Sequence, residues 1–278
     1  MDCTTFLQWS LPQRGLRWPG FRKVHRQVCK RLKRRMAELE LGDFSDYRAR
    51  LDADRQEWRI FDECCHITIS RFYRDRGVFD CLRQRVLPDI AARAKDEGRD
   101  ARIWSAGCAS GEEPYTLKIL WDLEIAETYA GVSISITATD VDKTMLTRAR
   151  TACFEKTGVR ELPAHLVEQA FDPVGPQLCV KPRHREGIQF SEQDLQLQAP
   201  ATRFDLILCR YVTFTYFALP LQQRLLASML ERLLPHGYLV IGTHEHLPST
   251  SGLAPLDHAP QIFQRSADMV SPLSAGGS

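Results

Sequence analysis

The segment that most constrains the fold of this chain is residues 101–120, which read ARIWSAGCASGEEPYTLKIL. A short β-prone run ends in Ser105, Ala106 and Gly107, and a loop closed by Gly111 follows. The sequence then takes the apolar periodicity of a helix. A strand, a glycine turn and a helix in this order open an α/β cofactor-binding domain, because glycines let the backbone approach a ligand closely.

The predicted helix begins with two carboxylates, Glu112 and Glu113. Carboxylates would repel the phosphates of a nucleotide, but they suit a ligand with cationic groups, such as the sulfonium and ammonium of S-adenosylmethionine. A β-branched run over residues 132–139 then ends at Asp140. An acidic residue at the end of the second strand is where such domains hold ribose hydroxyls. The alternative for Asp140 is the N-cap of the following helix.

Residues 21–65 show three short amphipathic patterns, which predict a small helical unit. Residues 1–20 are interrupted by prolines and glycines and predict an irregular arm. The first helix, over residues 21–39, is either solvated on its basic face or docks an acidic partner there. Aromatic residues are not interspersed among these basic residues, and no nucleic-acid-binding motif accompanies them. As a partner of this face, an acidic protein helix is therefore favoured over nucleic acid. The basic residues are Arg22, Lys23, Arg26, Lys30, Arg31, Lys33, Arg34 and Arg35.

The composition of the 278 residues is that of a globular protein, with 44% hydrophobic and 26% charged residues. No apolar run reaches the roughly 18 residues of a membrane span, and no signal-peptide pattern is present. We therefore expect a cytoplasmic protein without membrane insertion. Nine cysteines are scattered without a CxxC pair, which predicts reduced thiols, several of them buried.

Residues 151–187 interrupt the alternation of strands and helices with prolines and short β-prone pieces, so they predict an inserted subdomain. Residues 204–209, FDLILC, form a continuous apolar run, as a buried parallel strand does. Further on, His244 and His246 flank Glu245, and a strand would place both histidines on one face. A third ligand at a suitable spacing is missing, so we predict no metal site.

Several segments, in order, resemble the chemotaxis receptor methyltransferases of the CheR type. AGCASGEEPY at 106–115 looks like the family's cofactor motif, and SRFYRD at 70–75 is similar to its Thr-x-Phe-Phe-Arg-Glu string. ATDVD at 138–142 and CRYVTFTYF at 209–217 resemble two further motifs. The resemblance implies S-adenosylmethionine as cofactor and S-adenosylhomocysteine as product. It implies a cofactor site made of Thr68, Ser70, Arg74, Ala106, Gly107, Gly111, Glu112, Glu113, Asp140, Val141, Asp194, Leu195, Tyr211 and Val212.

The resemblance also implies a catalytic role for Arg74, whose guanidinium can hold a carboxylate in a bidentate fork. Periodicity alone favours instead a surface ion pair of Arg74 with Asp75 or Asp80. Tyr216 is the expected hydrogen-bond donor to the acceptor, and Tyr211 is the third catalytic candidate. The implied reaction is methyl transfer to an ionised carboxylate, which needs orientation rather than a general base.

One motif departs from the family pattern. Where the family reads Cys-Arg-Asn-Val-Leu-Ile-Tyr-Phe, this chain has Tyr211 in place of the asparagine and one more residue before the Tyr-Phe pair. The departure lies where acceptor specificity is decided, so two functions stay open. One is methylation of a glutamate on a chemoreceptor-like protein. The other is methylation of a small-molecule acceptor in a specialised pathway.

The predicted architecture is α/β, with a Rossmann-like class I methyltransferase sheet, a β-subdomain insertion and a small all-α N-terminal domain. We expect residues 1–72 to form the helical domain and residues 73–278 the methyltransferase domain. The expected insertion is residues 151–187. Residues 266–278, rich in Ser, Gly and Ala, are expected to form a disordered tail.

Overall fold

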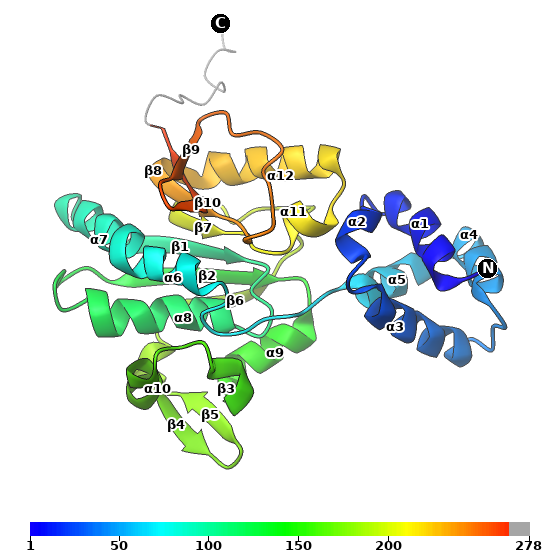
Figure 1. Cartoon of the computed structure of the whole chain (residues 1–278), viewed down its shortest axis with the longest axis horizontal. Coiled ribbons are helices and arrows are strands. Elements are labelled where there is room, and N and C mark those ends of the chain that lie inside the picture. Colours follow the sequence, from blue (N-terminus) through cyan, green and yellow to red (C-terminus); the bar gives the residue numbers. More distant parts are fainter. Residues whose placement is uncertain (267–278) are drawn as a thin grey trace, which may run out of the picture.

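The computed structural model describes residues 1–266, and the expected tail beyond Ser266 lies outside the described residues. Figure 1 shows a helical N-terminal domain and a larger α/β domain, joined by an extended linker. None of the helices in residues 1–266 is long and apolar enough to cross a membrane. The N-terminal domain consists of α1 (Cys3–Gln13), α2 (Trp18–Phe21), α3 (His25–Glu38), α4 (Phe44–Ala53) and α5 (Glu57–Cys65).

The expectation of an irregular arm over residues 1–20 is wrong, because most of this segment is α1 and α2. Asp2 caps α1 by accepting a hydrogen bond from the Thr5 N–H at 2.8 Å. Phe6 and Leu7 are buried in the core of the N-terminal domain. Burial of these side chains outweighs the low helix propensity of a proline in the last turn of α1.

The core of the N-terminal domain is aromatic and contains a buried ion pair. The Phe6 ring packs against Phe44 and Phe61. Glu57 is only 2% exposed and accepts two hydrogen bonds from Arg35, at 2.9 and 2.8 Å. Arg35 therefore belongs to the interior of the domain, although the sequence placed it on the basic face of a helix.

The α/β domain is built on a seven-stranded sheet of order β6-β2-β1-β7-β8-β10-β9. Strands β6, β2, β1, β7 and β8 are parallel, while β10 runs antiparallel to both of its neighbours, β8 and β9. The order changes direction between β1 and β7, and ligands of such sheets bind there at the carboxyl ends of the strands. The strands are β1 (Ala101–Ala106), β2 (Ile134–Asp140), β6 (Ile188–Glu192), β7 (Phe204–Leu208), β8 (Leu233–Val240), β9 (Leu253–Leu256) and β10 (Ala259–Arg265).

Helices lie on both sides of this sheet (Figure 1). Residues 76–96 form three consecutive helical segments, α6, η1 and α7, with a π-helical turn in the middle. The helices that accompany the large sheet are α6 (Arg76–Cys81), η1 (Leu82–Val86), α7 (Leu87–Asp96), α8 (Glu112–Leu120), η2 (Trp121–Ile125), α9 (Lys143–Thr151), α11 (Thr213–Tyr216) and α12 (Leu219–Arg232).

A second sheet of three antiparallel strands, in the order β3-β5-β4, lies within the predicted insertion. It is attached to the linker by aromatic contacts, because the Phe72 ring packs edge-on against Phe154 and Phe171 at 4.8 and 5.3 Å. Its elements are β3 (Cys153–Glu155), η3 (Lys156–Val159), α10 (Ala164–Ala170), β4 (Phe171–Val174), β5 (Gln177–Val180) and η4 (Pro182–His184).

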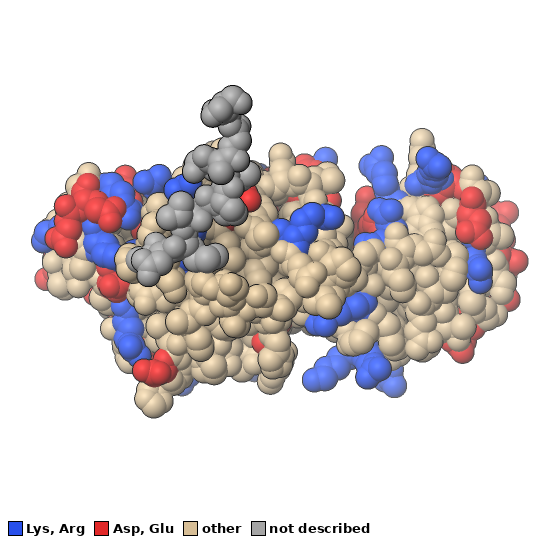
Figure 2. Space-filling model, turned by 90° about the horizontal axis from the view of Figure 1, so that it is seen from above, with Lys and Arg blue, Asp and Glu red and all other residues tan. Residues whose placement is uncertain are grey.

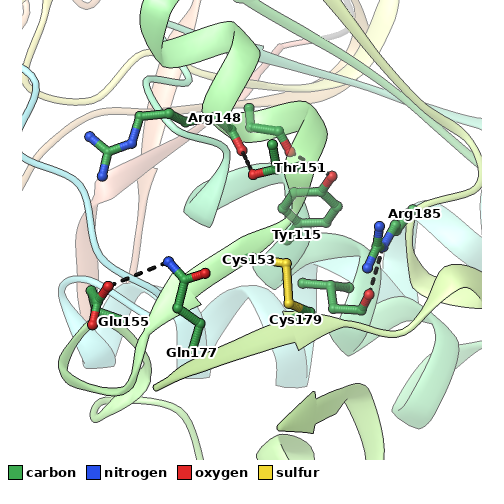
Figure 3. The surroundings of a disulfide bond; sticks show 10 residues. Tyr115, Arg148, Thr151, Cys153, Glu155, Gln177, Cys179 and Arg185 are labelled. Carbon is green, nitrogen blue, oxygen red and sulfur yellow. Dashed lines mark hydrogen bonds between the residues drawn. A yellow bond between two sulfur atoms is a disulfide. The ribbon is translucent and has the colours of Figure 1, made fainter. Parts of the chain in front are cut away.

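The expectation that all nine cysteines are reduced is wrong for four of them. Cys153 and Cys179 lie directly opposite each other on β3 and β5 and form a disulfide (Figure 3). Cys3 and Cys29 form a second disulfide, which joins α1 to α3. Both pairs are brought within disulfide reach by tertiary structure, which their spacing in the sequence does not reveal. The other five cysteines are free, and four of these are buried, as expected.

Candidate cofactor and acceptor site

The glycine turn lies at the carboxyl end of β1 and takes the conformation that its glycines allow. Gly107 and Gly111 have φ values of +82° and +93°, in the left-handed region that strains other residues. A β-carbon on Gly107 would lie 2.5 Å from the Val212 side chain, so this position has no room for one. The turn is therefore closely packed, with the Val212 side chain lying against Gly107.

Asp140 closes this turn from the end of β2. Its carboxylate accepts hydrogen bonds from the Ala109 N–H at 2.8 Å and from the Asp142 N–H at 2.9 Å. Burial raises the pKa of the Asp140 carboxyl, although both hydrogen bonds oppose this. The N-cap of α9 is Asp142, which accepts from Thr144 and Met145. An N-cap role for Asp140 is therefore wrong, and its carboxylate shapes the turn instead.

The two carboxylates at the start of α8 have different partners. Glu112 accepts a hydrogen bond from the Ser110 hydroxyl, at 2.9 Å from both of its oxygens. Glu113 accepts from the Ser105 hydroxyl at 2.7 Å and from Arg210 at 3.0 Å. Glu113 is thus balanced by a protein cation, whereas Glu112 keeps an uncompensated negative charge beside the turn. Glu112 is the better placed of the two for a cationic ligand.

Arg210 is buried at the carboxyl end of β7 between two carboxylates. Its side chain is 4% exposed and bonds Glu113 at 3.0 Å and Asp75 at 2.7 Å. Burial would lower the pKa of Arg210, but the charges of Glu113 and Asp75 outweigh it and raise the pKa. Arg210 also donates to the Arg74 carbonyl. Arg210 was not among the predicted site residues, although the sequence places it directly after a predicted buried strand.

Arg74 does not pair with Asp75 or Asp80, so the prediction from periodicity is wrong. Asp75 is taken by Arg210 and by the Tyr211 hydroxyl at 2.5 Å, and Asp80 accepts from Tyr73. The Arg74 guanidinium lies over the Tyr211 ring, 3.8 Å from its centroid, and donates to the Ile69 carbonyl at 2.6 Å. The linker thus brings Arg74 to the acceptor side, by which we mean residues 209–217, the segment that departs from the family pattern.

Tyr216 lies where the two domains meet. Its ring is 4.9 Å from that of Phe21, and its carbonyl accepts a hydrogen bond from the Arg17 N–H at 2.8 Å. Burial raises the pKa of Tyr216 to about 12, and the charge of Arg74 acts against this rise. The hydroxyl is therefore protonated at neutral pH, and it interacts electrostatically with the charge of Arg74.

The remaining predicted residues surround the turn at greater distance. Thr68 and Ser70 are partly exposed on the linker, and Val141 is 40% exposed just after β2. Asp194 follows β6 and accepts a hydrogen bond from the Gln196 N–H at 2.8 Å, and Leu195 packs on a core cluster under β7 and β8. These residues come from the linker and from the ends of two strands, β2 and β6, and within residues 1–266 no hydrogen bond joins one of them to another.

The stretch His244-Glu245-His246 is not a strand, so the strand geometry that would place both histidines on one face does not occur here. Both histidines are exposed, and Glu245 is buried. Its carboxylate accepts hydrogen bonds from the protein instead of pointing outward with the histidines. Within residues 1–266 no group of three or more metal-ligating side chains is present.

The sheet order, the glycine turn and the acidic strand end define a Rossmann-like methyltransferase domain of the S-adenosylmethionine-dependent class. Residues 68–260 match the family described as CheR methyltransferase, SAM binding domain. The chain therefore belongs to the CheR methyltransferase family. The left-handed glycines of the turn, the charge of Glu112 and the exposed Val141 fit the cofactor of this class.

Relatives support the assignment over most of the chain. Chemotaxis protein methyltransferase 2 of Pseudomonas aeruginosa is 32% identical over 235 residues, which cover 81% of this chain and 80% of the relative. Chemotaxis protein methyltransferase 1 of the same species is 35% identical over 182 residues, covering 63% of this chain and 65% of the relative. An uncharacterized 104.1 kDa protein of Rhodobacter capsulatus is 33% identical over 79% of this chain, which spans 23% of that protein.

Among solved structures, the N-methyltransferase NodS of Bradyrhizobium japonicum WM9 aligns with 70% of this chain and 99% of its own. Its sequence is 14% identical and its TM-score is 0.37.

Proposed function

We propose that this chain transfers the methyl group of S-adenosylmethionine to a carboxylate and forms a methyl ester. The observation that carries the proposal is the Arg74 guanidinium, which lies over Tyr211 and forms no ion pair within residues 1–266. An unpaired guanidinium at this position over Tyr211 can hold a carboxylate by two parallel hydrogen bonds. The acceptor oxygen would then be held in line with the methyl group.

The cofactor would be held by the turn at Gly107 and Gly111, by Glu112 and by Asp140, and it supplies an already activated methyl group. A carboxylate acceptor is ionised near neutral pH, so it needs no general base. The buried Glu245 accepts hydrogen bonds from the protein and is not free to act as one. Tyr216 keeps its proton and can donate a hydrogen bond to the acceptor.

The acceptor that we favour is a glutamate on a chemoreceptor-like protein helix in the cytoplasm, since the relatives are named chemotaxis protein methyltransferases. An acidic helix would meet the exposed basic residues of α3, including Arg26, Lys30 and Lys33. These three line a recess of about 420 Å³. Figure 2 shows Lys and Arg side chains at both the upper and the lower edge of the N-terminal domain, on the right of the view.

Two residues of the predicted basic face do not belong to this surface. Arg35 pairs with the buried Glu57, and Arg31 donates to the carbonyls of Cys64 and His66. Charge reversal at either position would disturb the fold of the N-terminal domain as well as any docking. A test of the surface must therefore use the exposed residues alone.

The first experiment incubates the protein with methyl-labelled S-adenosylmethionine and an extract of the host cell. Label in macromolecules that mild base releases as methanol supports a protein methyl ester. Base-stable label in small molecules would refute the carboxylate acceptor. It would favour the second candidate, a small-molecule methyltransferase, which the replacement of the family's asparagine by Tyr211 makes worth testing.

The second experiment compares two double charge reversals. Lys30→Glu with Lys33→Glu changes the basic face of α3, whereas Lys95→Glu with Arg203→Glu makes the same change in net charge at exposed positions of the α/β domain. We expect labelling of the protein acceptor to fall by roughly tenfold in the first variant, because the attraction to an acidic helix is lost. The second variant should stay within about twofold. Equal labelling by both variants would rule out docking through α3.

A further inference from the structure

Glu245 is the most enclosed acidic side chain on the acceptor side. Its residue is 6% exposed, and its carboxylate accepts hydrogen bonds from the Tyr211 N–H at 2.8 Å, the Gly242 N–H at 2.7 Å and the Thr215 hydroxyl at 2.6 Å. Burial raises the pKa of this carboxyl, and the three hydrogen bonds act against the rise. Because its oxygens accept from these three donors, we infer that Glu245 holds the local conformation and does not transfer protons.

Two of these donors belong to the segment in which this chain departs from the CheR-type pattern. Tyr211 stands where that pattern has asparagine, and Thr215 lies in the stretch that is one residue longer. Tyr211 has a φ of +58°. Asparagine adopts this left-handed conformation readily, but a bulky aromatic residue does so only when its surroundings hold it. The hydrogen bond from the Tyr211 N–H to Glu245 is one such restraint.

The Tyr211 side chain is held as firmly as its backbone. A β-carbon on Gly242 would lie 2.7–2.8 Å from the ring, so the ring packs directly on the Gly242 backbone. The hydroxyl donates to Asp75 at 2.5 Å and accepts from the Thr243 N–H at 3.2 Å. The ring therefore has one fixed place, and the Arg74 guanidinium lies over it at 3.8 Å.

We propose that Glu245 is a positioning residue and that, through Tyr211, it sets the orientation of the Arg74 guanidinium toward the methyl acceptor. Glu245, Tyr211 and Arg74 then form the element that decides which acceptor this chain accepts. The inference rests on the proposed function in one respect, namely that Arg74 faces the acceptor. It does not depend on whether the acceptor is a protein carboxylate or a small molecule.

The test compares Glu245→Ala with Glu245→Gln. The glutamine carbonyl can accept both N–H bonds and its amide can donate to the Thr215 hydroxyl oxygen, so this variant keeps the geometry. We expect Glu245→Gln to transfer label to the cell extract within about threefold of the wild type. We expect Glu245→Ala to lose roughly 10- to 100-fold, because a displacement of about 1 Å in a reacting group costs that much. The exposed neighbour His246→Ala is the matched control and should behave as the wild type.

The affinity for S-adenosylhomocysteine, measured by calorimetry, separates positioning from general damage. It should change less than about threefold in Glu245→Ala, because the contacts of the cofactor turn do not involve Glu245. Loss of this affinity in proportion to the loss of transfer would overturn the proposal. Transfer by Glu245→Ala at the wild-type rate would overturn it too, as would equal losses in the alanine and glutamine variants.

Tyr211→Asn keeps the test decisive should Glu245→Ala not fold. Asparagine tolerates the left-handed backbone but removes the ring beneath Arg74. We expect an altered ratio of labelled acceptors in the extract, and an unaltered ratio would refute the proposal. The chemistry of the wild-type label decides the proposed function separately. Base-stable label would reject the carboxylate acceptor, while the comparison of variants on that same label would still decide the role of Glu245.

Discussion

Replacement of Arg210 by methionine tests whether one buried cation holds the linker, the cofactor turn and the acceptor side together. Arg210 bonds Asp75 of the linker and Glu113 of α8, and its side chain is 4% exposed. Removing one partner of a buried ion pair costs about 3–5 kcal/mol, because it leaves charge buried and unpaired. Asp75 keeps the Tyr211 hydroxyl and Glu113 keeps the Ser105 hydroxyl. We therefore expect the lower end, about 3 kcal/mol.

For a chain of this size, about 3 kcal/mol corresponds to a fall in Tm of roughly 6–12 °C. Differential scanning calorimetry at neutral pH measures it. Arg50→Met is the control, since Arg50 forms an exposed i,i+4 pair with Asp54. Such pairs contribute about 0.3–0.5 kcal/mol, so the control should lose no more than about 2 °C. An equal fall in Tm for both variants would refute the role assigned to Arg210.

The pH dependence gives an independent check through Asp75. Burial would raise the pKa of this carboxyl, but the hydrogen bond from Tyr211 and the charge of Arg210 lower it below its usual value. A carboxyl with a lowered pKa stabilises the fold above its unfolded pKa, and this contribution is lost as the pH falls through the folded pKa. Without Arg210, burial dominates and the pKa of Asp75 rises. Protonation of Asp75 at lower pH then removes the unpaired buried charge of the variant. The gap in Tm between variant and wild type should therefore narrow from pH 7 toward pH 4.5, and a constant gap would contradict the argument.

Three further changes have outcomes that the structure determines. Asp140→Ala removes the acceptor of two backbone N–H groups at the cofactor turn. Such charged bonds contribute about 1.5–3 kcal/mol, so calorimetry should show roughly 10- to 100-fold weaker binding of S-adenosylmethionine. Gly107→Ala should also weaken binding, and addition of Val212→Ala should restore part of it by removing the 2.5 Å clash while leaving the unfavourable φ. Cys153→Ser opens a loop of 26 residues and should lower the stability by up to about 3.5 kcal/mol. Reductant should lower the Tm of the wild type more than that of this variant, because the variant has only the Cys3–Cys29 disulfide left to lose.

The features that sequence reasoning predicted correctly are those determined by residues close together in the chain. The glycine turn after β1 follows from residues 105–111, and the buried strand over residues 204–209 follows from its own apolar run. The pairing of Arg210 with Asp75 joins residues 135 positions apart. No local pattern distinguishes it from the pairing of Arg74 with Asp75, which periodicity favoured. The disulfide across β3 and β5 likewise depends on strand register, which the spacing of the cysteines does not encode.

The acceptor-side segment is restrained from two directions, and this explains why a small helical domain precedes the catalytic sheet. On one side, Gly20 of α2 lies so close to the Thr215 carbonyl that a β-carbon would approach it to 2.2 Å, and the Arg17 N–H binds the Tyr216 carbonyl. On the other side, Glu245 holds the Thr215 hydroxyl and the Tyr211 N–H. The position of Tyr216 therefore depends on how the N-terminal domain packs. A partner that bound the proposed surface on α3 would bind the same domain that contacts Thr215 and Tyr216, so we expect docking to influence acceptor alignment.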